Sequence, residues 1–167
     1  LADWVGPKAF QSALSSYMKK HAFKNTITDD LWAAFEKASG KPVKKMMTTW
    51  TRTEGYPLVT GTRVKNKLTL SQQRFFLTPK KSTATWPVPV SVTFGPKPKT
   101  TTLLLGPKAV TIPVPSGATH YKINAGEVGF YRTGYAPEDL TALSHWSVLK
   151  KLQPADRLGL VRDLHTL

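Results

Sequence analysis

The feature that most constrains this chain is a change of hydrophobic period at Gly55-Tyr56-Pro57. Before this point, apolar residues recur at helical spacing. The clearest stripe comprises Val43, Met46, Met47 and Trp50. Gly55 can end a helix in a left-handed turn, and Pro57 cannot continue one because it lacks a backbone N–H. Beyond Pro57 the period becomes two, so the sequence predicts a helical block joined to a β-rich block.

Three helices are predicted ahead of this change, over residues 7–24, 28–39 and 42 to about 54. Thr28 is a favourable N-cap for the second helix, because its hydroxyl can accept a bond from the first turn. The acidic pair Asp29-Asp30 suits that turn, where the helix dipole favours negative charge. Gly40 is placed to end the same helix.

Seven strands are predicted after the change, over residues 58–64, 67–77, 88–94, 100–105, 108–114, 119–124 and 127–135. Pro87 and Pro89 favour an edge position for the third strand, because proline cannot donate to a sheet ladder. Helical patterns return at Pro137 and Pro154. The fold class predicted is therefore α+β: helices, then a seven-stranded β-sandwich, then further helices.

Charge is concentrated in the predicted sandwich. The chain of 167 residues has a net charge of +14, and residues 58–136 hold eleven Lys/Arg against one acid, Glu127. Such an excess can attract a polyanion such as a nucleic acid. We favour a solvated basic face, or one that meets an acidic neighbour, because no nucleic-acid-binding motif accompanies the charge.

Cysteine content, the length of hydrophobic runs and the first residues narrow the possible locations and kinds of site. There is no cysteine, which excludes disulfides and thiolate metal sites and fits a reducing, cytoplasmic location. The chain contains no run of eighteen apolar residues, so no membrane span is predicted. The first residues, Leu1-Ala-Asp-Trp4, lack the features of a signal peptide, and we expect residue 1 to be a boundary within a longer protein.

No catalytic, cofactor-binding or metal-binding residue is predicted in this chain. None of its four histidines (His21, His120, His145 and His165) belongs to a His-Glu-x-x-His motif. The acidic pairs Asp29-Asp30 and Glu138-Asp139 are interpreted as first-turn helix charges. Arg132 has two interpretations: a clamp for a carboxylate or phosphate, or a partner for an acid across a domain boundary, with Phe130 and Tyr131 packing in a strand. We favour the second.

Four groups of residues, in order along the chain, form a recognisable set. They are Phe10, Tyr17, 21–26 and 30–32; then Trp50 and 55–57; then Asn124, Gly126, 129–132 and Tyr135; then Asp156, Arg157 and Leu160. In this order they resemble the middle of a zinc aminopeptidase of the aminopeptidase N type. The run 38–43, followed by Met46, Met47 and Trp50, is most similar to the cytosolic puromycin-sensitive branch.

The resemblance implies an internal fragment in three segments. Residues 1–57 resemble the helical end of a thermolysin-like catalytic domain, 58–136 a β-sandwich domain, and 137–167 the start of an α-helical C-terminal domain. The family's zinc motif and substrate-binding segment are absent here, so zinc would belong to the parent enzyme and this chain alone would be inactive. Tyr17 is not expected to be the family's catalytic tyrosine, because it lies on an apolar helical stripe.

The leading hypothesis is therefore that this chain forms the scaffold and the inter-domain spacer of an aminopeptidase that removes N-terminal residues from peptides. Its partners would be the remaining domains of the same protein. One alternative is a stand-alone basic sandwich that binds nucleic acid or another polyanion. Another is a non-enzymatic interaction domain derived from the peptidase fold. An exposed apolar patch near Trp4, Phe10 or the C-terminal leucines would favour either this domain or a truncated enzyme.

Overall fold

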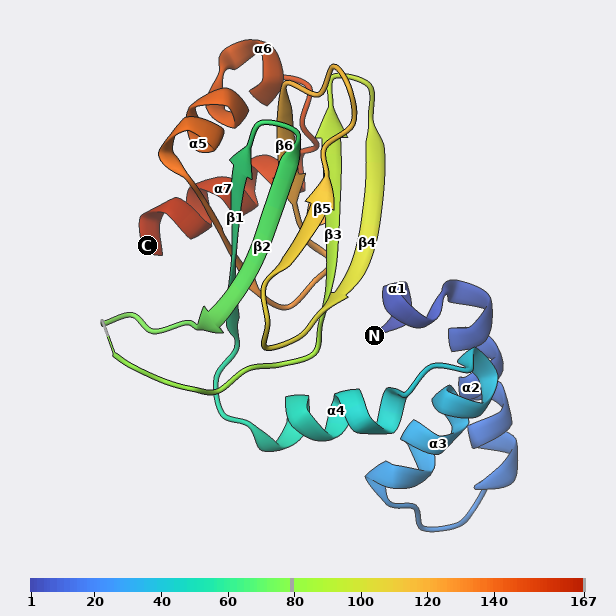
Figure 1. Cartoon of the computed structure of the whole chain (residues 1–167). Helices are drawn as coiled ribbons and strands as arrows, with labels where there is room; N and C mark the ends of the chain where they lie inside the picture. The colour runs from blue at the N-terminus through green and yellow to red at the C-terminus, as the bar shows by residue number, and fades with distance from the viewer. Residues whose placement is uncertain (79, 167) are drawn as a thin grey trace. The chain divides into compact units, whose positions relative to one another are not determined.

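The computed structural model describes residues 1–78 and 80–166. The chain forms two compact units, Leu1–Glu54 and Gly55–Leu167 (Figure 1). The boundary between them coincides with the change of period found in the sequence. Within the described residues, no helix combines the length and the apolar character that crossing a bilayer requires.

The first unit is helical. It contains α1 (Ala2–Val5), α2 (Pro7–Lys20), α3 (Thr28–Ser39) and α4 (Val43–Arg52). Its core comprises Val5, Ala13, Phe35 and Val43, with the Phe10 and Phe35 rings 5.0 Å apart. The three predicted helices are thus confirmed, and α1 is an additional short one.

Two details of the helix ends differ from the prediction. Ile27, rather than Thr28, occupies the N-cap of α3, and the Asp30 carboxylate accepts a bond from the Ile27 N–H at 3.1 Å. The N-terminal end of α3 is therefore capped by the carboxylate of Asp30, in its first turn. The helix α4 ends at Arg52 with Thr53 as its C-cap, so the prediction that Gly55 ends this helix was wrong.

The second unit contains two sheets and four short or medium helices. Its strands are β1 (Pro57–Val64), β2 (Lys67–Arg74), β3 (Val88–Gly95), β4 (Lys99–Leu105), β5 (Val110–Pro113), β6 (His120–Ile123) and β7 (Arg132–Tyr135). The helices are η1 (Ala125–Glu127), α5 (Pro137–Ser144), α6 (Trp146–Leu149) and α7 (Pro154–Thr166). The α+β class with seven strands is confirmed.

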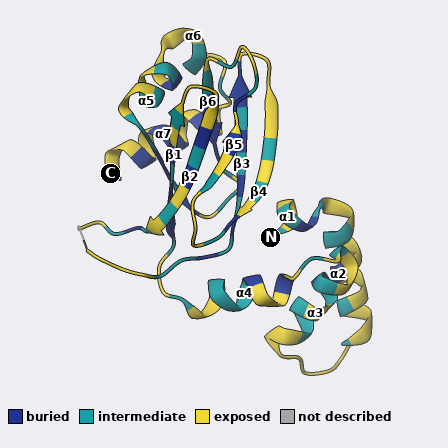
Figure 2. Cartoon of the chain, in the orientation of Figure 1, coloured by how far each residue is buried: buried dark blue, intermediate teal, exposed yellow. Residues whose placement is uncertain are grey.

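The strands form a sheet of order β5-β2-β1-β7 and a second of order β4-β3-β6. All pairings are antiparallel except that of β1 with β7. Val88, Val90, Val92 and Phe94 lie on one face of β3 and are at most 1 % exposed (Figure 2). Gly61 of β1 lies so close to Ile123 and Tyr121 of β6 that a Cβ atom there would come within 3.0 Å of both side chains. The inner faces of the two sheets therefore pack against each other.

The position of β3 corrects one prediction. It is the central strand of its sheet and not an edge. Pro89 is tolerated because β6 pairs only with Val92–Gly95, which leaves the side of β3 at Pro89 without a second neighbour. Proline is thus at a local edge inside a central strand.

The last predicted strand, 127–135, is also corrected. Residues Ala125–Glu127 form η1, and only Arg132–Tyr135 are a strand. The Asn124 side chain forms two bonds with Gly129, accepting from its N–H at 2.7 Å and donating to its C=O at 3.0 Å. This local closure replaces strand pairing, and Asn124 and Glu127 adopt positive φ angles within it.

Candidate functional site

The largest concentration of buried charge lies where the η1 turn meets α7. Lys122 is only 2 % exposed, and its Nζ lies 2.7 Å from Glu127 Oε1 and 3.8 Å from Asp156 Oδ1. Asp156, in the first turn of α7, also accepts a bond from the Gly126 N–H at 2.7 Å. A buried ammonium group requires such partners, because removal of a charge from water is otherwise costly.

Glu127 links this buried lysine to a second cation. Its Oε2 lies 2.9 Å from Arg162 of α7. The carboxylate reaches this position across Gly159, where a Cβ atom would come within 2.1 Å of the carboxylate carbon. Glycine in mid-helix costs about 1 kcal/mol relative to alanine, and here it provides the space in which the ion pairs form.

Arg132 belongs to the adjacent half of the same cluster. Its guanidinium lies 3.0 Å from Asp163 Oδ1. The other oxygen, Asp163 Oδ2, accepts bonds from the Thr133 N–H at 2.9 Å and the Thr133 hydroxyl at 2.8 Å. Both Asp163 and Thr133 are 2 % exposed, so α7 is fixed to β7 by a buried carboxylate with all its partners in place.

The contacts of Arg132 agree with the favoured interpretation. Its guanidinium pairs with an acid from the segment 137–167, as the favoured interpretation expected. The aromatic residues beside it differ from the prediction in part. Both Phe130 and Tyr131 lie outside any strand. Tyr131 is buried, whereas Phe130 is 72 % exposed, with its ring 5.4 Å from that of Tyr56.

A second carboxylate fixes α5 to both sheets. Asp139 Oδ2 accepts bonds from the Arg63 N–H of β1 and the Tyr121 hydroxyl of β6, both at 2.9 Å. Burial raises the pKa of Tyr121 far above its ordinary value, and the bond to Asp139 raises it further. Tyr121 therefore remains neutral and donates a hydrogen bond to Asp139. This first-turn acid thus links α5 to both sheets in addition to complementing the helix dipole.

The four histidines lie apart in the fold. His21 caps α2, His120 bonds to Thr119 Oγ1, His145 caps α6 through Ser147, and His165 lies in the last turn of α7. The Ser147 Oγ to His145 Nδ1 distance of 2.7 Å is a local capping contact at an exposed position. Among residues 1–78 and 80–166, no group of three His, Cys, Asp or Glu side chains could hold a metal ion.

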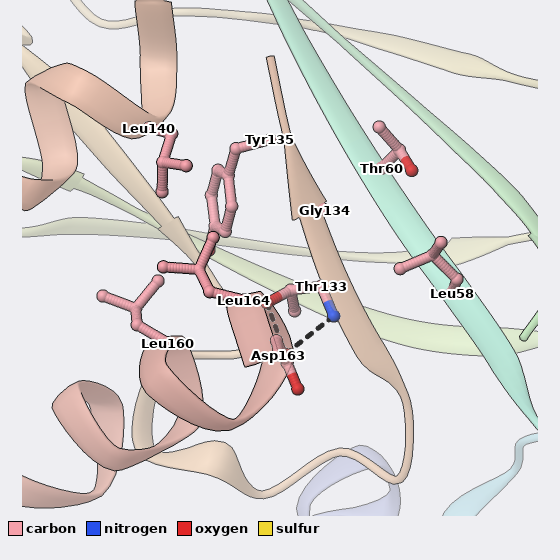
Figure 3. A pocket seen from close by; sticks show the side chains of 9 residues that line it. All are labelled: Leu58, Thr60, Thr133, Gly134, Tyr135, Leu140, Leu160, Asp163 and Leu164. Atoms are coloured by element: carbon pink, nitrogen blue, oxygen red, sulfur yellow. Dashed lines mark hydrogen bonds between the residues drawn. The ribbon is translucent and has the colours of Figure 1, made fainter. Parts of the chain in front are cut away.

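Two pockets adjoin these contacts. One of about 270 Å³ lies between the β1–β7 edge and the helices α5 and α7, lined by Leu58, Tyr135, Leu140, Leu160 and Leu164 (Figure 3). Asp163 faces it but is bonded to Thr133. The volume is smaller than that of ordinary ligand sites.

The other pocket, of about 480 Å³, lies beside His120, between the end of β3 and the segment 147–156. Burial lowers the pKa of His120, and the charge of Lys151 lowers it further, so the imidazole is neutral at pH 7.

The ionised groups of the cluster around α7 are hydrogen-bonded or ion-paired within it, and these contacts hold α7 against β7 and η1. Asp156 is among the residues that carry the resemblance, whereas no role was predicted for Asp163. The available signal was their spacing of seven, which places both carboxylates on one face of α7.

Comparison with known proteins supplies the family. The Peptidase family M1 domain matches residues 1–50. Rice Aminopeptidase M1-D is 37% identical over an alignment that covers the whole of this chain and 20% of that protein. Rice Aminopeptidase M1-C is 38% identical with the same coverage, and human Glutamyl aminopeptidase is 37% identical over the whole chain and 18% of its own length.

This chain is similar to M1 aminopeptidases along its whole length, and its residues 1–50 match the M1 domain. It spans about a fifth of the length of these curated relatives. The resemblance inferred from four groups of residues is therefore confirmed over the entire chain. The names of these relatives describe aminopeptidases.

Proposed function

We propose that this chain is the scaffold and spacer portion of a zinc-dependent aminopeptidase that removes N-terminal residues from peptides. The observation that carries the proposal is the identity of 37% with both a plant and a human aminopeptidase across all of the chain. Such uniform similarity favours a part of that enzyme over an unrelated module that shares only its sandwich.

The proposal assigns each of three segments to a different domain of the enzyme. Residues 1–57 are the helical end of a thermolysin-like catalytic domain, 58–136 the spacer, and 137–167 the start of an α-helical domain. The M1 match over residues 1–50 lies within the first compact unit and supports the first assignment. The bonds of Asp139 and Asp163 support the role of spacer, because they fix α5 and α7 firmly to the sheets.

Among the residues that the structure describes, no group of side chains fits zinc. Its histidines occupy helix ends and a strand end, and the clustered carboxylates near α7 are engaged by lysine and arginine. In our proposal the metal, the general base and the substrate-binding segment are all supplied by other parts of the enzyme.

The test is peptidase activity of the purified 167-residue chain. Fluorogenic aminoacyl substrates are incubated with the chain, with and without added zinc, and a longer protein that includes the family's zinc motif serves as the positive control. We expect turnover only from the control. Turnover by the short chain that a chelator abolishes would contradict the proposal.

A cytoplasmic location is part of the same proposal and rests on the cysteine-free sequence. Fractionation of cells that make the protein tests it directly. A secreted product would contradict this part without affecting the enzymatic assignment.

The alternative of polyanion binding draws on the net charge of the sandwich. Two of its eleven cations, Lys122 and Arg132, are already engaged by acids. A titration with single-stranded DNA at rising salt separates the readings, since non-specific affinity for a polyanion falls steeply with salt. We expect only weak binding at low salt.

A further inference from the structure

The register of the second sheet determines which backbone groups of its outer strand, β4, face away from the protein. Pro89 has no N–H and lies opposite Leu104. Pro89 and Leu104 therefore cannot exchange a pair of hydrogen bonds, and the backbone N–H and C=O groups of Leu104 point away from β3. Alternation along the strand gives Thr100 and Thr102 the same orientation.

Contacts on the other side of β3 agree with this alternation. Ser91 C=O accepts from Asn124 N–H and Gly95 C=O accepts from Thr119 N–H, both toward β6. Ser91 is opposite Thr102 in the register. The backbone N–H and C=O groups of these two residues therefore point away from each other. The free edge of β4 thus presents the N–H and C=O groups of Thr100, Thr102 and Leu104.

The other sheet edges are closed by specific contacts. At β7, the outward N–H of Thr133 is bonded to Asp163. At β6, the N–H of Ile123 is bonded to the Tyr135 hydroxyl at 2.9 Å, and its C=O accepts from Lys122 at 2.7 Å. The remaining edge strand, β5, has four residues and ends at Pro113. These are common ways of protecting an edge.

The β4 edge has none of these protections. It is seven residues long, contains no proline, and consists of Lys99-Thr-Thr-Thr-Leu-Leu-Leu105. Figure 2 shows most of the strand as exposed, and the Leu104 side chain is 44 % exposed. Within the part of the chain that the structure describes, β3 is the one strand that pairs with β4 in a sheet. A long open edge is a template for another strand.

Charge indicates the kind of strand that fits. Lys99 is the first residue of β4 and Lys97 lies in the turn before it, and both are exposed. The one acid of residues 58–136, Glu127, is already bonded to Lys122 and Arg162, so the sandwich has no carboxylate of its own to offer. A second copy of the chain would bring another +14 charge to the edge.

We propose that the free edge of β4 binds an extended acidic segment of a partner polypeptide by β-strand addition. Backbone hydrogen bonds to Thr100, Thr102 and Leu104 supply the affinity, and carboxylates facing Lys97 and Lys99 fix the orientation. The inference does not depend on the proposed peptidase origin, since it rests on sheet register and charge alone.

The experiment uses the full 167-residue chain labelled with ¹⁵N and a nine-residue peptide of alternating valine and threonine with two glutamates at one end. We expect slowed amide exchange at Thr100, Thr102 and Leu104, with little change at Thr101 and Leu103. A peptide with lysines in place of the glutamates is expected to bind at least about tenfold more weakly.

Two variants at one position isolate the backbone contribution. Thr102→Pro removes an outward N–H without breaking the β3 ladder, and we expect about a tenfold loss of affinity. Thr102→Val removes the same hydroxyl but keeps the N–H, and we expect a change of less than about twofold. Unchanged circular dichroism confirms that both variants fold.

Three outcomes overturn the proposal. The first is peptide binding that Thr102→Pro leaves unaltered. The second is slowed exchange at these amides in the chain alone with a dimer seen by sedimentation, which would assign the edge to a second copy. The third is the same protection in a full-length family protein without partner, which would mean that the parent covers its own edge.

Discussion

Asp163→Ala is the substitution with the largest expected effect on stability. The carboxylate is 2 % exposed and accepts bonds from the Thr133 N–H, the Thr133 hydroxyl and Arg132 at 2.8–3.0 Å. Truncation leaves the buried groups of Thr133 without an acceptor, at about 1–3 kcal/mol for each unsatisfied group. It also leaves Arg132, whose side chain is 18 % exposed, without its carboxylate partner.

The expected loss is about 3–5 kcal/mol in the free energy of unfolding, as found when one partner of a buried ion pair is removed. Arg162 adds little, because its side chain is 44 % exposed and solvent screens its charge. Asp163→Asn keeps an oxygen for Thr133 but loses the charge, and we expect about 2 kcal/mol.

The assay is urea unfolding followed by circular dichroism, with hydrogen exchange at the Thr133 amide as a local readout. A loss of this size lowers the urea midpoint by about 2 M for a domain with an ordinary denaturant slope. The matched control is Asp29→Ala, which breaks the exposed ion pair between Asp29 and Lys44. We expect the control to leave the midpoint almost unchanged.

One outcome would refute the reasoning. If Asp163→Ala shifts the midpoint no more than Asp29→Ala and leaves exchange at Thr133 unaltered, the carboxylate does not fix α7 to β7. A double-mutant cycle with Arg132→Met then measures how much of any loss belongs to the ion pair.

Three further predictions concern the same unit. Gly159→Ala is expected to destabilise it by about 1–3 kcal/mol despite the better helix propensity of alanine, because the new methyl group displaces the Glu127 carboxylate; urea unfolding beside Leu158→Ala, an exposed neighbour, checks this. Folding raises the pKa of Tyr121, so its contribution is complete below about pH 10 and is lost as pH rises beyond it; Tyr121→Phe should flatten the alkaline fall in stability. NMR titration should give His120 a pKa below 6.5, and Lys151→Ala should raise it, whereas no response to Lys151→Ala would contradict the stated charge effect.

Local patterns predicted the element types well. The stripe in α4, the alternation in β3 and the change at Pro57 each depend on residues a few positions apart, and each was confirmed. Two of the misses, at the N-cap of α3 and in 127–135, arose from side-chain to backbone contacts that periodicity does not report. Periodicity also gives no sign that Gln72 of β2 bonds through its amide to the N–H and C=O of Trp86 and to the C=O of Leu105 in β4, which joins the strand to the opposite sheet.

The sequence by itself determined the helical and β-rich blocks, the excess of positive charge and the M1 relationship. These follow from periodicity and from residue identities, which are local properties. Tertiary structure alone decided that Asp163 holds β7, that Glu127 occupies the space over Gly159, and that β4 keeps an open edge. Such facts depend on which strands and helices become neighbours, and loop closure between residues 30 or more positions apart leaves no periodic trace in the sequence.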